Sequence, residues 1–237
     1  MLNYKQLLLL LILVGMSLPA LSIGFGQGNW RWRNDDGDDT SATWKADERT
    51  PIVLTHKNNI RLRVQMGNTF LLNLSADIIE LGYSYDDGTN WFVIEDDETS
   101  GHFVYAESPH FTNQDASTQQ LSVFPGACDT FVPGFLFDTI DPLSPNNHPE
   151  LDQGEGTELE FSIRATEQAL DLTEYRFGLF TVFDISNETP MNLCSGTTTI
   201  TLTTNFNAQQ VPLAPWALFL AIALIISAKI FMVRRFY

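Results

Sequence analysis

The chain has 237 residues, of which 18% are charged and 12% are aromatic, and its formal net charge is −16. Such an acidic surface repels nucleic acid and anionic lipid, so neither is expected as a partner. The aromatic content is too high for a solvated disordered tail, so the composition predicts a folded acidic domain.

The first 22 residues (1–22) have the pattern of a secretory signal peptide. Lys5 lies in a short polar start, an apolar run covers 7–14, and Ala20-Leu21-Ser22 offers the small residues that signal peptidase needs. An uncleaved membrane helix is the alternative, although the run is short for a span. We expect cleavage near Ser22, which would place residues 24–210 outside the inner membrane.

Residues 24–207 show the alternation of apolar and polar residues that marks strands. The pattern is clearest where Ile60, Leu62 and Val64 alternate with polar residues, and it recurs within 159–164 and 199–203. Further strands are expected at 30–33, 78–85, 91–95, 102–106 and 175–183. Many short strands without intervening helices predict an all-β antiparallel β-sandwich, with one face of each sheet in a core and the other in water.

The segment 30–37, with the sequence WRWRNDDG, loosely resembles the start of a β-sandwich module that recurs in bacterial envelope and secreted proteins. No activity follows from this resemblance. Because side chains alternate along a strand, Trp30 and Trp32 are expected to pack in the core while Arg31 and Arg33 face water.

Three acidic clusters could supply oxygen ligands to calcium. They are Asp35, Asp36, Asp38 and Asp39; Glu95 to Glu98; and Asp138 with Asp141. The first cluster is the calcium candidate, although its spacing is not that of an EF-hand, and the alternative is a set of solvated loops. No other cofactor is expected, and the four histidines show no metal-ligand spacing.

Ser84, Asp86, Gly88 and Trp91 fit the pattern S-x-D-x-G-x-x-W. This pattern resembles the Asp-box of sialidases and other β-rich extracellular proteins, in which the box is structural and stands away from the active site. Its physical basis is a hairpin: the glycine adopts a positive φ, the aspartate accepts hydrogen bonds from turn amides, and the tryptophan packs beneath. We therefore expect a structural turn at this position.

Cys128 and Cys194 are the two cysteines of the chain. In an exported domain a pair of cysteines most often forms a disulfide, and we expect one here. A catalytic thiol is the alternative, but no histidine stands in a recognisable partner motif. Nucleophile-elbow, zinc-protease and phosphate-loop motifs are absent from the sequence, and no catalytic residue is expected.

The tail, residues 208–237, has the pattern of a membrane anchor. Residues 213–233 are long and apolar enough to cross a bilayer as one transmembrane helix, and Trp216 suits one interface. Arg234 and Arg235 mark the cytoplasmic side by the positive-inside rule. The membrane is therefore an expected partner.

The tail also resembles the C-terminal sorting domains of the PEP-CTERM and IPTL-CTERM type, which combine a short motif, one helix and a terminal arginine cluster. The matching residues are Val211, Pro212, Trp216, Arg234 and Arg235. The resemblance implies a membrane-embedded exosortase as a processing partner in a Gram-negative envelope. No Pro-Glu-Pro triplet is present, and a permanent anchor would have the same pattern.

Without its two ends the chain keeps nine of its 13 basic residues and all 29 acidic ones, a balance of −20. We expect an exported cell-envelope protein, anchored in the inner membrane facing the periplasm or sorted to the cell surface, with a non-enzymatic structural or surface domain. One alternative is a module that binds surface polysaccharide, and another is a small hydrolase such as a glycosidase. A planar row of exposed rings would favour the binder, with Tyr83, Tyr85, Trp91 and Phe92 as candidates, whereas converging carboxylates would favour the enzyme.

Overall fold

The computed structural model describes residues 24–68, 79–99, 101–124, 128–139, 150–181, 188–194 and 197–207. The predicted signal peptide, the predicted transmembrane tail and Asp141 lie outside these residues. Within them the chain forms twelve strands, and no helix that could cross a membrane occurs there. The prediction of an all-β domain is confirmed for this part of the chain.

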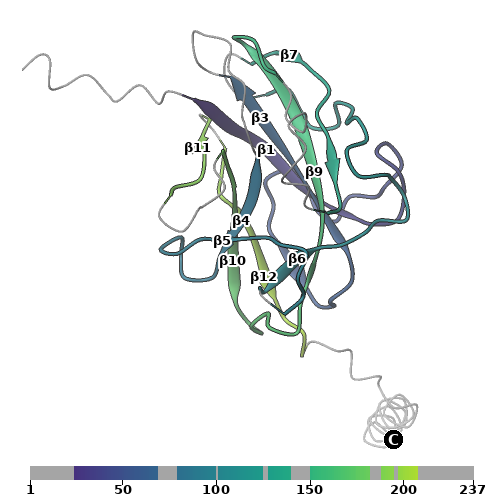
Figure 1. Cartoon of the computed structure of the whole chain (residues 1–237), viewed down its shortest axis with the longest axis vertical. Helices are drawn as coiled ribbons and strands as arrows, with labels where there is room; N and C mark the ends of the chain where they lie inside the picture. Colours follow the sequence, from purple (N-terminus) through teal and green to yellow (C-terminus); the bar gives the residue numbers. More distant parts are fainter. Residues whose placement is uncertain are drawn as a thin grey trace, which may run out of the picture.

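The first sheet has seven strands built around three long ones. Its main order is β11 (Asn192–Leu193), β1 (Phe25–Asn34), β3 (Ile60–Asn68), β9 (Glu155–Ala165) and β6 (Phe103–Tyr105). Two short strands, β7 (Thr130–Phe131) and β8 (Leu136–Phe137), also pair with β9. β1, β3 and β9 pair antiparallel over most of their length and run side by side in Figure 1.

The second sheet has five strands, in the order β2 (Ile52–Leu54), β12 (Ile200–Thr204), β10 (Glu174–Phe180), β4 (Glu80–Ser84) and β5 (Phe92–Val93). Both sheets are mixed, not purely antiparallel as predicted, because β11, β2, β7 and β8 each join a neighbour in parallel. These strands have only two or three residues, so no alternation shows in them and no hairpin fixes their direction.

The two sheets share one apolar core. Trp30 and Trp32 of β1 are fully buried in it, and their indole N–H groups donate to the carbonyls of Thr198 (2.8 Å) and Thr201 (3.1 Å) in and next to β12. The ring of Trp32 meets that of Phe177 on β10 edge to face, with centroids 5.4 Å apart. The prediction that both tryptophans lie in the core is confirmed.

The opposite face of the first sheet is also buried. Arg33 on β1 and Arg61 and Arg63 on β3 are all fully buried there. Loop carbonyls from residues 37–42 and from Thr118 accept hydrogen bonds from their guanidinium groups, which shows that two loops cover this face. The prediction that Arg33 faces water is wrong, because alternation tells which side of a strand a residue occupies and not what lies on that side.

Candidate functional site

The densest group of charged side chains lies on this second face, and we call it the ionic layer. Its members are Arg33 of β1, Arg61 and Arg63 of β3, Glu158 and Glu160 of β9, and the loop residues Asp35 and Asp39. The strand register brings them together: Arg33 stands opposite Arg61, and Arg63 opposite Glu160.

Glu160 lies at the centre of the ionic layer. Its Oε2 accepts hydrogen bonds from Nη1 of Arg33 (2.9 Å) and Nη1 of Arg63 (2.6 Å). Its Oε1 accepts one from Nη1 of Arg61 at 2.9 Å. All four side chains are 0% exposed, so this carboxylate is shared by three guanidinium groups out of reach of any substrate.

Three further carboxylates complete the layer. Arg61 Nε donates to Asp35 Oδ1 at 2.9 Å, and Arg63 donates to Asp39 Oδ1 at 2.6 Å and to Glu158 Oε2 at 2.7 Å. Buried charges are costly unless they are paired and hydrogen-bonded, and here nearly every donor has an acceptor. Nε of Arg33 is the guanidinium nitrogen left without a partner among the described residues.

The pKa values of two arginines show how the charges balance. Burial lowers the pKa of Arg33, and Glu160 offsets only part of that effect. Burial acts on Arg63 in the same direction, but Glu160, Glu158 and Asp39 together raise its pKa above the usual value. Arg33 is therefore the less compensated of the two, and it depends on Glu160 for its charge partner.

The four aspartates predicted as calcium ligands divide into two pairs, Asp35 with Asp39 and Asp36 with Asp38. The first pair faces the buried arginines, as described above. In the second pair, Thr43 donates to Asp36 and Ser41 donates to Asp38, which lowers both pKa values, that of Asp38 to about 2. Protein donors thus occupy all four carboxylates, and the described residues hold no group of three or more His, Cys, Asp or Glu placed to bind a metal ion.

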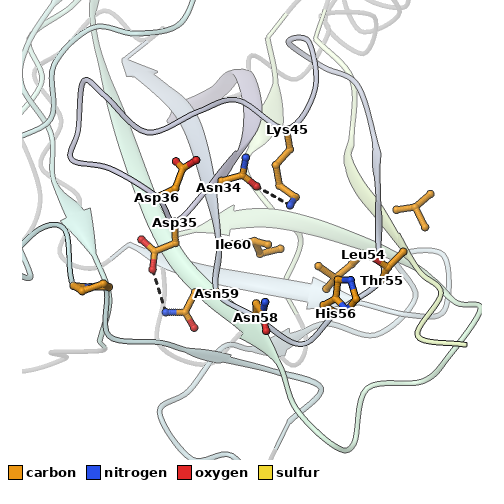
Figure 2. A pocket seen from close by; sticks show the side chains of 12 residues that line it. Asn34, Asp35, Asp36, Lys45, Leu54, Thr55, His56, Asn58, Asn59 and Ile60 are labelled. Carbon is orange, nitrogen blue, oxygen red and sulfur yellow. Dashed lines mark hydrogen bonds between the residues drawn. The ribbon is translucent and has the colours of Figure 1, made fainter. Parts of the chain in front are cut away.

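An open depression of about 490 Å³ lies beside the loop after β1, which carries these aspartates (Figure 2). The end of β1, the loop after it and the connection from β2 to β3 supply its walls, with Leu54 and Ile60 as apolar members. Two hydrogen bonds order its polar side chains: Lys45 Nζ donates to Asn34 Oδ1 at 2.9 Å, and Asn59 Nδ2 donates to Asp35 Oδ2 at 3.2 Å. Amide, carboxylate, ammonium and imidazole groups together suit a polar ligand rich in hydroxyl groups.

A second depression, of about 440 Å³, shares Asn59 with the first and is more acidic. Its lining includes Asp96, Glu107 and Asp138, with Arg164 as the basic member. Burial raises the pKa of Asp138, and the N–H of Ser108, which donates to its Oδ2 at 3.1 Å, works against that rise. Asp96 and Asp138 belong to two of the acidic clusters named in the sequence, and the fold adds Glu107, which lay in none of them.

The predicted Asp-box turn joins β4 to β5. Gly88 has a φ of +85° and its N–H donates to the hydroxyl of Ser84 at 3.0 Å. Asp86 Oδ1 accepts hydrogen bonds from the Ser84 hydroxyl (2.8 Å) and from the Asn90 N–H (2.9 Å). Trp91 packs edge-on against Phe180, with centroids 5.3 Å apart. The groups of this turn bond to one another, as a turn that stabilises a hairpin requires.

The four rings named as sugar-stacking candidates do not form a planar row. Tyr83 is buried, and Trp91 is half-buried against its neighbour. Tyr85 and Phe92 are each 37% exposed, but they stack on one another with centroids 5.2 Å apart and an angle of 12°. Since each ring covers a face of the other, this cluster offers a sugar little free ring surface.

The two cysteines are free thiols in the structure, with Cys128 buried and Cys194 half-buried. The N–H of Cys194 donates to the Gln27 carbonyl at 2.9 Å, and Cys128 lies against Gly67 on the neighbouring strand β3. Burial raises the pKa of Cys194 to about 11, and nearby Cys128 adds to that rise. The fold therefore brings the two thiols into one region, and their disulfide stays a prediction.

Two charged features of the fold were missed in the sequence. One is the ionic layer, whose signal was the matching two-residue period of Arg61 with Arg63 and of Glu158 with Glu160. The other is Glu80, buried on β4, whose pKa burial and the neighbouring Glu95 raise to about 7. Nothing in the local sequence marks Glu80, because its burial depends on strands far away in the chain.

No protein-family model matches the chain, and neither a curated protein nor a solved structure is detectably similar to it. The predicted anchor residues Val211, Pro212, Trp216, Arg234 and Arg235 lie outside the described residues. The functional argument therefore combines the geometry of the domain with the sequence pattern of the two ends.

Proposed function

We propose that this protein is an exported cell-envelope protein whose β-sandwich domain is a non-enzymatic structural or surface module. The observation that carries the proposal is the ionic layer. Glu158, Glu160, Asp35 and Asp39 are the acidic side chains that the fold gathers most tightly, and each is paired with a buried arginine. Carboxylates that are paired with buried arginines stabilise one arrangement of loops and strands. They are not free to act as acids or bases on a substrate.

The location follows from the pattern of the two ends. A signal peptide at 1–22 would export the domain, and the apolar stretch 213–233 with Arg234 and Arg235 would hold it at the membrane. Both an exosortase-processed tail and a permanent anchor are compatible with this arrangement. In spheroplasts of a bacterium producing the full chain, external protease should degrade the domain and spare the final residues. Protection of the domain in intact spheroplasts would overturn the proposed orientation.

Binding of a surface polysaccharide is the second candidate function, and the depression in Figure 2 is the observation that favours it. Its amide, ammonium and carboxylate groups match the hydroxyl groups of sugars. The full chain in detergent should then bind a glycan on an array, and Asn58→Ala should weaken that binding. Thr89→Ala, in the turn between β4 and β5, is the matched control and should leave it unchanged. Equal loss in both variants would contradict a site at the depression.

A further inference from the structure

The loop between β9 and β10 carries two exposed leucines. Leu172 is 71% exposed, more than any other large hydrophobic residue that the structure describes, and Leu170 is 46% exposed. Single exposed apolar side chains are common on soluble proteins, whereas exposed apolar side chains that gather in one place mark contact surfaces. We call residues 166–173 the leucine loop.

Hydrogen bonds hold the leucine loop against the last described residues of the chain. The Thr204 hydroxyl donates to the Leu170 carbonyl at 2.6 Å, and the Thr173 N–H donates to that hydroxyl at 3.1 Å. Asp171 accepts a hydrogen bond from the Phe206 N–H at 2.7 Å and another from the side chain of Asn207. The leucine loop therefore lies where the chain leaves the domain after β12, at the lower end of Figure 1.

The backbone at Leu172 is held in an unusual conformation. Its φ is +51°, in the left-handed region that bulky residues rarely adopt. Strain of this kind persists where the surrounding structure enforces it, and it gathers at functional sites. Here the hydrogen bonds to Thr204 and Asp171 enforce a turn that directs an apolar side chain outward.

The length of chain beyond the domain identifies the surface that this loop would meet. Five residues, 208–212, separate Asn207 from residue 213, where the predicted membrane span begins. Asn207 and residue 213 are thus six Cα–Cα steps apart, which span at most about 22 Å when fully extended. We propose that the leucine loop rests on the bilayer that holds the tail, with Leu170 and Leu172 in the interfacial layer. This inference rests on the proposed membrane anchor and adds a defined orientation of the domain to it.

The charges at this end of the domain indicate which lipid surface is suitable. Lys57, whose Nζ lies 5.2 Å from the centre of the Phe206 ring, is paired with Glu167 at 2.8 Å. Glu167 and Glu174 are exposed on either side of the leucines. Lys57 is therefore not free to pair with an anionic lipid, and the two exposed glutamates would repel one. Contact through apolar side chains suits a zwitterionic surface instead.

Photocrosslinking of the full chain in phosphatidylcholine vesicles tests the proposal. One form carries benzoylphenylalanine in place of Leu172, and the matched control carries it in place of Val123, which is 70% exposed. Val123 is a fair control because its carbonyl accepts a hydrogen bond from Asn29 in β1, toward the opposite end of the sheets. Illumination should give lipid adducts at 172 and none at 123. Leu170→Asp, added to the chain with the probe at 172, should abolish the adducts.

The outcomes separate the anchor from the loop contact. Vesicles are first floated on a density gradient, and a chain that does not float with them would overturn both the anchor and the loop contact. A chain that floats but gives equal adducts at 172 and 123, or none at 172, would overturn the loop contact alone. Adducts from 172 to a second copy of the chain would replace the bilayer by a protein interface and would also overturn it.

Discussion

The two faces of the first sheet are both largely buried and are chemically opposite. On one face, Trp30, Trp32 and Phe161 pack in an apolar core, and on the other, Arg33 and Glu160 lie in the ionic layer without any exposure. A strand that alternates between apolar and charged residues therefore need not separate a core from water. In this protein the alternation separates two interiors, one stabilised by burial of apolar area and the other by matching of charge.

The two interiors should respond differently to substitution. An apolar core loses stability in proportion to the volume removed, because a cavity forms and neighbours relax only in part. A buried charge network loses stability when the number of opposite charges changes, even if no volume is removed. The predictions below use changes that alter one property and keep the other.

Glu160→Gln tests the ionic layer most severely. The change conserves shape but leaves Arg33, Arg61 and Arg63 with less negative charge, so the free energy of unfolding should fall by about 3–5 kcal/mol. The control is Glu98→Gln, because the pair of Glu98 with Arg164 is exposed and should contribute at most about 1 kcal/mol. Urea unfolding of the purified protein measures both, and equal effects would contradict a special role for the buried layer.

Trp32→Ala tests the apolar face. Trp32 is fully buried, and its removal should cost about 3–5 kcal/mol. Trp91→Ala removes the same side chain from a half-buried position between β4 and β5, and roughly half that cost is expected because less apolar area is lost from the interior. Midpoints of urea unfolding give the comparison. If Trp91→Ala costs as much as Trp32→Ala, the hairpin turn contributes more to the core than the burial implies.

The buried carboxyl group of Glu80 predicts a pH dependence of the free energy of unfolding. Its pKa of about 7 in the folded protein lies above the ordinary value of 4.5, because burial and Glu95 disfavour the charged form. The folded state therefore holds the proton more tightly, and stability from this group is greatest below pH 4.5 and falls as the pH rises through 7. Glu80→Gln should raise the free energy of unfolding at pH 8 by up to about 3 kcal/mol and change it little at pH 4. An equal gain at both pH values would contradict the assignment.

The turn between β4 and β5 should give the smallest effects. Gly88 has a positive φ, where a β-branched side chain is strained, so Gly88→Val should cost on the order of 1–3 kcal/mol. Asp86→Ala removes acceptors from an exposed turn and should cost less than Gly88→Val. Thermal unfolding of the two variants shows the order. The reverse order would indicate that the carboxylate, not the glycine, determines the turn.

The sequence predicted the parts of the structure that depend on local patterns. The alternation at Ile60, Leu62 and Val64 marked β3, and the pattern from Ser84 to Trp91 marked a hairpin turn between two strands. The two-residue period of Arg61 and Arg63 was visible in the sequence, but the burial of these side chains was not predictable, because the loops that cover them lie elsewhere in the chain. Likewise, the parallel strands are too short for periodicity, and their direction depends on which edge of a sheet is free.

A double-mutant cycle between Arg33 and Glu160 tests the central claim most directly, since Glu160 is the carboxylate that Arg33 contacts. The free energy of unfolding is measured by urea for the native protein, Arg33→Met, Glu160→Gln and the double variant. If the second face is an interior held by matched charge, removing both partners should cost less than the sum of the single costs, with a coupling energy of about 1–3 kcal/mol. Additivity within about 0.5 kcal/mol would show that the two buried charges do not stabilise one another, and would contradict the account.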